Sequence, residues 1–187
     1  MAATPSLIFI TGGVRSGKSS YAERTAEKIA ARAGGNLYYI ATGVSFDSEM
    51  KERIRKHQED RKNQQVHWNT MEKSVSIGDL APHVQDQDIL LLDCVTTLLN
   101  NELYAGGHKS EKSVYDKMIS GILALRGRAG TLIVVSNEVL NEPLLDNALV
   151  LSYKRLLGSI HQRLVEESDQ AYLVEAGIPV AMKKVSA

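Results

Sequence analysis

The segment GGVRSGKSS at residues 12–20 constrains the fold of this chain more than any other feature of its sequence. It has the spacing G-x-x-x-x-G-K-S, with Gly12, Gly17, Lys18 and Ser19 at the fixed positions. An apolar run precedes it and a helical pattern follows it. Glycines let successive backbone N–H groups point at one anion, and the helix behind them adds its positive dipole end. The segment therefore predicts a phosphate-binding loop (P-loop); a glycine-rich turn that only joins a strand to a helix is the alternative.

A P-loop assigns separate roles to its residues. We expect Lys18 to reach the β and γ phosphates of a nucleoside triphosphate and Ser19 to ligate Mg²⁺. A second Mg²⁺ ligand should be an acid after a buried strand, and Asp93 follows the apolar run 89–92. Helix capping is the alternative role for Asp93, and Glu138 is a second candidate acid at the same sheet edge. The predicted nucleotide contacts of the loop are Gly12, Gly13, Val14, Arg15, Ser16, Gly17, Lys18, Ser19 and Ser20.

Short apolar runs alternate with longer helical patterns along the chain. The runs lie at residues 7–11, 37–41, 89–93, 131–136 and 171–174, and the helical patterns at 19–32, 47–61, 112–128 and 146–168. Such alternation indicates βαβ units around a parallel sheet. Residues 66–70 are a candidate edge strand, and 104–113 a loop. We therefore predict one α/β, P-loop NTPase-like domain over residues 1–187, with a mainly parallel sheet covered by helices on both faces.

The composition argues against two classes of partner. Lys plus Arg total 22 and Asp plus Glu total 22, so no net charge favours nucleic acid or an anionic membrane. No apolar run reaches the roughly 20 residues of a membrane span. The single cysteine, Cys94, allows no internal disulfide and suits a reducing compartment. These observations predict a cytoplasmic protein.

The segment FDSEMKERIRKHQEDR at residues 46–61 carries a second group of candidate residues. Arg53, His57 and Arg61 are four residues apart, so they would share one side of a helix. Two guanidinium groups could bind a phosphate and favour the neutral, nucleophilic form of the imidazole between them. On spacing alone, a solvated helix face remains the alternative.

Taken in order, these stretches resemble the adenosylcobinamide kinase/adenosylcobinamide-phosphate guanylyltransferase family. The matching segments are TGGVRSGKS, YIATG, DSEMKERIRKHQEDR, HWNTMEK, LLLDCVTTLLNN, VSNEV and DQAYLVEAGIPV, which span nearly the whole chain. The resemblance implies that a nucleoside triphosphate, ATP or GTP, phosphorylates adenosylcobinamide with Mg²⁺. GTP then guanylylates a histidine, which passes GMP to adenosylcobinamide phosphate. That histidine corresponds to His57, so Lys18 and His57 are the predicted catalytic residues.

The resemblance also implies further nucleotide contacts and an assembly. The contacts are Thr42, Gly43, Val44, Gln58, Glu59, Asp60, Arg61, Glu72 and Asp93, and the spacing argument above adds Arg53 as a predicted nucleotide contact. One carboxylate would accept hydrogen bonds from the guanine base, and whether it belongs to Glu72 or to Asp93 is open. The family further implies a homo-oligomer, with a trimer as the candidate form. Two alternatives remain: a simpler P-loop kinase in which His57 only binds phosphate, and a regulatory GTP-binding module.

The chain departs from the usual pattern of this family mainly in its second half. Members usually carry Glu at the position of Asp93, a glycine-rich segment in place of residues 140–143, and Asn at the position of His161. These differences concern the corrinoid-facing side more than the nucleotide site.

Overall fold

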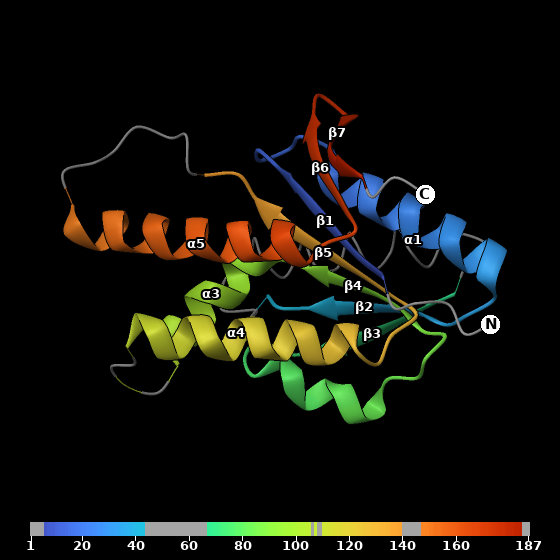
Figure 1. Cartoon of the computed structure of the whole chain (residues 1–187), viewed down its shortest axis with the longest axis horizontal. Coiled ribbons are helices and arrows are strands. Elements are labelled where there is room, and N and C mark those ends of the chain that lie inside the picture. The colour runs from blue at the N-terminus through green and yellow to red at the C-terminus, as the bar shows by residue number, and fades with distance from the viewer. Residues whose placement is uncertain (1–5, 44–66, 106, 108–109, 140–146, 185–187) are drawn as a thin grey trace.

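The structure is a computed structural model that describes residues 6–43, 67–105, 107, 110–139 and 147–184. Its centre is a seven-stranded sheet with the order β3-β2-β4-β5-β1-β6-β7 (Figure 1). Neighbouring strands are parallel except β6 and β7, which are antiparallel. The strands are β1 (Ser6–Gly12), β2 (Leu37–Ala41), β3 (Trp68–Glu72), β4 (Ile89–Asp93), β5 (Thr131–Asn137), β6 (Gln170–Glu175) and β7 (Ile178–Lys184). The predicted α/β class with a mainly parallel sheet is confirmed.

Helices cover both faces of the sheet, and each face has its own core. Helices α3 (Val95–Tyr104), α4 (Glu111–Arg126) and α5 (Ala148–Glu167) pack with Leu7, Phe9 and their neighbours. Helix α1 (Lys18–Ala33) packs with Ile8, Ile10 and their neighbours on the opposite face. Because successive strand residues face opposite sides, strands buried on both faces appear as unbroken apolar runs in the sequence.

Several elements were not predicted from the sequence. They are α3, the short 3₁₀ helix η1 (Ile77–His83) and strand β7. The sequence of α3, VTTLLNNELY, combines β-branched residues and asparagines of low helix propensity, so packing of its buried leucines decides its conformation. Strand β3 confirms the candidate edge strand, shifted by two residues from the predicted 66–70. Of the loop predicted at 104–113, residues 105, 107 and 110 are described outside helices, whereas 104 ends α3 and 111–113 begin α4. The predicted helix at 47–61 lies outside the described residues.

Strands β1 and β5 mark the part of the sheet edge where the topology predicts a ligand crevice. These two strands are neighbours, and Gly12 of β1 pairs with Asn137 of β5. The helix that follows β1 lies on one face of the sheet, whereas the next described helix after β5 lies on the other. Adjacent strands that send their chains to opposite faces leave a crevice at their carboxyl ends, where α/β proteins bind ligands.

Candidate active site at the carboxyl edge of the sheet

The P-loop has the strand–loop–helix geometry that its sequence predicts. Arg15 and Gly17 are left-handed, with φ of 60° and 89°, and Gly17 is the N-cap of α1. A Cβ on Gly12 would lie 2.4 Å from the carbonyl oxygen of Val174, so only glycine fits there. The N-cap Gly17 has no side chain, and within the described part of the chain no side-chain cap of this helix start is formed. The loop therefore presents the N-terminal N–H groups of α1 to an anion.

Lys18 places its ammonium group inside the loop. The side chain is only 5% exposed, and Nζ donates a hydrogen bond of 3.3 Å to the carbonyl oxygen of Gly13. The buried Ser16 Oγ has no hydrogen-bond partner among the described residues. A buried cation and an unsatisfied hydroxyl beside open backbone amides fit a phosphate group.

The turn between β6 and β7 supports the P-loop from the other end of the chain. The N–H of Gly177 donates a hydrogen bond of 2.8 Å to the carbonyl oxygen of Ser16. A Cβ on Gly17 would lie 3.1 Å from Cα of Gly177. Nothing in the local pattern of either segment indicates this contact.

Asp93 lies at the carboxyl end of β4, as predicted. Its Oδ2 accepts a hydrogen bond of 3.1 Å from the hydroxyl of Tyr39 on the neighbouring strand β2. Asp93 and Gly12 both end their strands at this edge of the sheet, with β5 between them. The carboxylate therefore belongs to the same edge as the P-loop.

Thr42 also lies at this edge, but its hydroxyl already forms hydrogen bonds with backbone groups. Its hydroxyl lies 3.1 Å and 3.0 Å from the carbonyl oxygens of Asp93 and Cys94, and it accepts a 2.9 Å hydrogen bond from the N–H of Cys94. The residue is fully buried. Its hydroxyl therefore joins the ends of β2 and β4.

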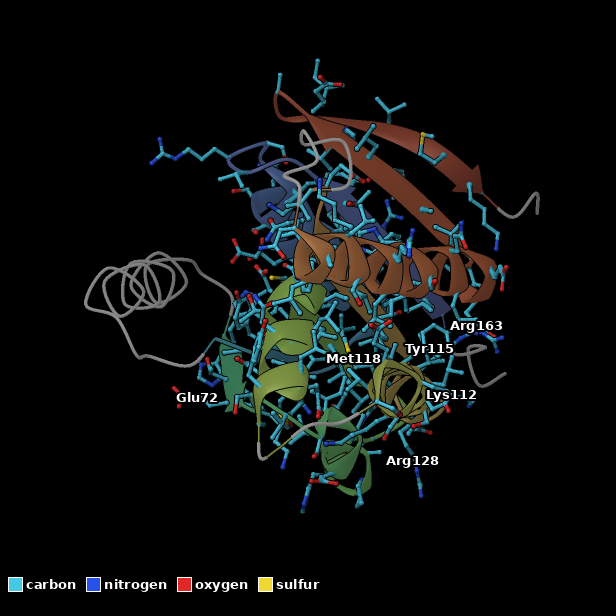
Figure 2. All side chains as sticks on the ribbon, turned by 90° about the vertical axis from the view of Figure 1, so that its left-hand side faces the viewer. Glu72, Lys112, Tyr115, Met118, Arg128 and Arg163 are labelled. Carbon is cyan, nitrogen blue, oxygen red and sulfur yellow. The ribbon has the colours of Figure 1, made fainter. Side chains whose placement is uncertain are left out.

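Two further acids that the sequence singles out, Glu72 and Glu138, lie within the described ranges. Glu72 is exposed at the end of the edge strand β3 (Figure 2), and Glu138 donates its N–H to the carbonyl oxygen of Gly12 at 2.9 Å. Across the described ranges, no three His, Cys, Asp or Glu side chains gather into a metal cage. Mg²⁺ needs no such cage, because one or two side chains and the substrate phosphates hold it. The residues outside the described ranges are Val44, Arg53, His57, Gln58, Glu59, Asp60 and Arg61.

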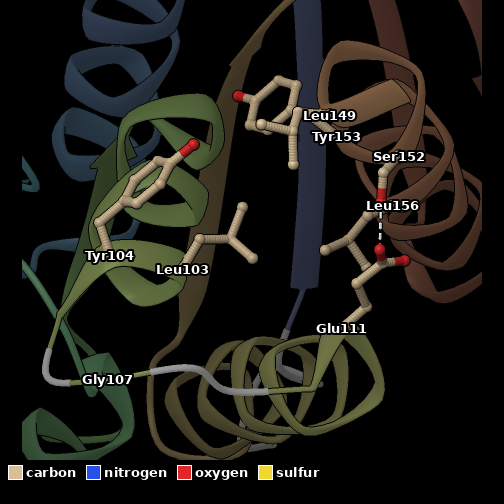
Figure 3. A pocket seen from close by; sticks show the side chains of 8 residues that line it. All are labelled: Leu103, Tyr104, Gly107, Glu111, Leu149, Ser152, Tyr153 and Leu156. Atoms are coloured by element: carbon tan, nitrogen blue, oxygen red, sulfur yellow. Dashed lines mark hydrogen bonds between the residues drawn. The ribbon is translucent and has the colours of Figure 1, made fainter. Parts of the chain in front are cut away.

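A cavity that the sequence did not indicate lies between α3 and α5. One part, of about 460 Å³, reaches Asn137 and Thr96; a second part, of about 610 Å³, reaches Glu111 at the start of α4. Both parts are lined by Tyr104, Leu149 and Tyr153. Figure 3 shows Tyr104 on α3 facing Leu149 and Tyr153 on α5 across the second part. Only the packing of two helices far apart in sequence creates this space.

Hydrogen bonds hold the walls of this cavity. The Tyr153 hydroxyl donates to the carbonyl oxygen of Thr96 at 3.3 Å, and Ser152 donates to Glu111. Burial, followed by the nearby Cys94 and Tyr104, raises the pKa of Tyr153 to about 12. The phenol therefore stays protonated and remains a donor at physiological pH.

None of the helices in the described ranges is long and apolar enough to cross a membrane.

The fold resembles two solved structures at 11% and 12% identity. The KaiC-like protein PH0186 of Pyrococcus horikoshii matches with a TM-score of 0.50, covering 91% of this chain and 71% of that one. The flagellar accessory protein FlaH of Methanocaldococcus jannaschii matches with a TM-score of 0.51, covering 97% and 80%. At such identities the likeness concerns the fold alone.

Sequence comparison identifies the family. A model described as "Cobinamide kinase / cobinamide phosphate guanyltransferase" matches residues 8–182. The bifunctional adenosylcobalamin biosynthesis protein CobU of Salmonella typhimurium is 32% identical over 95% of this chain and 99% of its own. CobU of Escherichia coli is 30% identical over the same shares, and CobP of Pseudomonas aeruginosa is 32% identical over 93% and 95%. The chain therefore belongs to the cobinamide kinase / cobinamide phosphate guanyltransferase family and is a nucleotide-dependent kinase and guanylyltransferase.

Proposed function

We propose that this chain performs both reactions at the one nucleotide site of the P-loop, in adenosylcobalamin biosynthesis. In the first, a hydroxyl oxygen of adenosylcobinamide attacks the γ phosphorus of ATP or GTP. The bond to the β-phosphate oxygen breaks, the nucleoside diphosphate leaves, and the hydroxyl proton passes to solvent. The observation that carries this proposal is the buried ammonium of Lys18 inside a glycine-shaped loop. There it would neutralise the charge that develops on the phosphates.

The second reaction runs through His57. An imidazole nitrogen attacks the α phosphorus of GTP, and pyrophosphate leaves. A phosphate oxygen of adenosylcobinamide phosphate then attacks the same phosphorus, so the P–N bond breaks and the imidazole is released. His57 lies outside the described residues. This step is supported by the family match and by the flanking arginines in the sequence.

The strand order supports separate roles for the two acids. Asp93 ends a strand two positions from β1, roughly 10 Å away, whereas Glu72 ends a strand four positions away, roughly 19 Å. Only the nearer acid can reach a cation bound to phosphates in the P-loop. We therefore assign Mg²⁺ binding to Asp93 and Ser19, and guanine recognition to Glu72. When bound, Mg²⁺ would offset charge on the phosphate oxygens.

A covalent-labelling experiment tests the guanylyl step. The purified chain is incubated with Mg²⁺ and α-³²P-GTP, denatured, and treated with acid or base. We expect an acid-labile, base-stable label that His57→Ala abolishes. His67→Ala is the matched control, because His67 is an exposed histidine beside β3, and it should keep the label.

Other outcomes of this experiment separate the alternatives. If the chain phosphorylates adenosylcobinamide but carries no label, the simpler P-loop kinase is the correct alternative. If it binds GTP with neither label nor turnover, the regulatory GTP-binding module is the correct one. Equal loss of both activities in a folded His57→Ala variant would make His57 a shared binding residue.

Self-association of the chain is the remaining part of the proposal. Strand β7 ends the sheet and exposes three apolar side chains at alternate positions: Ile178 (66%), Val180 (47%) and Met182 (66%). An open edge strand with such a stripe suits pairing with a second copy of the chain. We expect a homo-oligomer, with a trimer as the predicted form, in the cytoplasm. Light scattering should show Val180→Lys shifted toward the monomer; an unchanged mass would contradict this interface.

A further inference from the structure

We propose that the cavity between α3 and α5 binds the corrinoid acceptor and presents its reacting group to the P-loop. This inference rests on the proposed function, because it concerns the second substrate of the same site.

The position of the cavity provides the first argument. Its inner end is formed by Asn137, which pairs in register with Gly12, the first residue of the P-loop. The next residue, Glu138, donates its N–H to the Gly12 carbonyl oxygen at 2.9 Å. Adjacent strands lie about 4.8 Å apart. A molecule in the cavity thus has one end a single strand away from the loop that holds the phosphates.

The lining provides the second argument. Tyr104 is 79% exposed and Leu149 is 77% exposed, yet these side chains come from different helices and line the same space. Isolated exposed apolar residues are ordinary, whereas a concave apolar surface indicates a ligand site. A corrin is a broad ring system with an apolar face, and it would cover these side chains.

The polar residues of the cavity suit the rest of such a ligand. Thr97, Asn100 and Asn137 supply hydroxyl and amide groups toward the inner end. The amide side chains of a corrinoid are both donors and acceptors, so these neutral groups can pair with them. Lys154 and Glu111 add one charge of each sign to the lining of the cavity. The side chain of Asn137 is already oriented, because its Nδ2 donates to Thr96 Oγ1 at 2.9 Å.

The cavity is also distinct from the nucleotide site. The triphosphate is expected at the N-terminus of α1, on the opposite face of the sheet from α3 and α5. The two substrates would therefore approach the carboxyl ends of β1 and β5 from opposite faces. This arrangement lets one acceptor site serve both transfers.

Equilibrium dialysis with adenosylcobinamide, read by the visible absorption of the corrin, tests the proposal. The variant Tyr104→Ala/Leu149→Ala removes both exposed side chains, which contribute little to folding because they are exposed. We expect its Kd for adenosylcobinamide to rise at least about tenfold, which corresponds to about 1.4 kcal/mol, because two apolar contacts with the ligand are lost. Its Kd for GTP and its covalent guanylylation should match the unaltered chain.

Kinetics and a control variant complete the experiment. The KM for adenosylcobinamide should rise in the double variant while the KM for the nucleotide stays constant. Lys112→Ala/Asp116→Ala, an exposed ion pair on α4 outside the cavity, should bind the corrinoid normally. Unchanged corrinoid affinity in the double variant would overturn this site alone. Absence of corrinoid binding by the unaltered chain would overturn the site together with the proposed function.

Discussion

The backbone N–H of Gly177 donates a hydrogen bond of 2.8 Å to the carbonyl oxygen of Ser16, which ties the β6–β7 turn to the P-loop. Gly177 is left-handed, with φ of 80°, as the turn requires. The carbonyl oxygen of Val174 also packs so closely on Gly12 that no side chain fits between them. The C-terminal hairpin is therefore part of the framework that shapes the P-loop.

Gly17→Ala should disrupt this framework. Gly17 has φ of 89°, and an added Cβ would lie 3.1 Å from Cα of Gly177. An alanine side chain would force the loop and the hairpin apart, and we expect this distortion to cost at least about 1.4 kcal/mol of binding free energy. The Kd for Mg·GTP, measured by isothermal titration calorimetry, should therefore rise at least about tenfold. Gly34→Ala is the matched control. Gly34 is also left-handed but has open space around it, so its substitution should cost about 1–2 kcal/mol of stability and leave the Kd unchanged.

Lys18→Ala should reduce both reactions. The ammonium group is the buried cation of the P-loop, and losing one such electrostatic contact costs roughly 10²–10³ in rate. Steady-state rates of corrinoid phosphorylation and of protein guanylylation measure this loss. Lys28→Ala, an exposed lysine on the same helix, should retain both rates. Unchanged turnover in Lys18→Ala would remove Lys18 from the catalytic machinery.

Tyr39→Phe should weaken the response to Mg²⁺. The phenol holds the Asp93 carboxylate through a hydrogen bond of 3.1 Å, and such a bond is worth about 1 kcal/mol. We expect the Mg²⁺ concentration for half-maximal activity to rise roughly fivefold, since 1.4 kcal/mol corresponds to tenfold. Tyr38→Phe is a suitable control because Tyr38 packs against the opposite face of the sheet. If both variants need the same Mg²⁺ concentration, Tyr39 does not position a metal ligand.

His161 should make stability depend on pH. It is buried against Phe9, and its Nε2 lies 2.7 Å from Ser136 Oγ. Burial lowers its pKa below the ordinary 6.5, and the charge of Glu138 partly opposes that change. The unfolded chain then binds more protons than the folded chain between the lowered pKa and about 6.5, so stability falls as pH decreases through this window.

Urea unfolding at pH 7.5 and at pH 5.5 measures this effect. The neutral variant His161→Asn should lose less stability between the two pH values than the unaltered chain. His83→Asn, which changes an exposed histidine, should keep the original pH dependence. An identical loss in His161→Asn would show that His161 is not the titrating group.

The local sequence predicts the strands well where both faces are buried. The predicted bounds of β2 and β4 agree with the structure, because each strand is an unbroken apolar run between the two cores. The prediction fails for α3 and β7. Helix α3 depends on the burial of Val95, Leu98 and Leu99, and β7 contains a proline that an edge strand tolerates. His57 and its neighbours stay predictions because they lie outside the described residues.

The sequence by itself determined the P-loop, the parallel sheet and the place of Asp93, because each depends on the spacing of neighbouring residues and on the apolar character of one strand. The tertiary structure decided which elements support those residues. The bond from Tyr39 to Asp93, the contact of Gly177 with Ser16 and the cavity between Tyr104 and Leu149 join segments 45 to 161 positions apart. Such pairs meet only after the strand order and helix packing are established, and local periodicity carries no record of which distant residues will be neighbours.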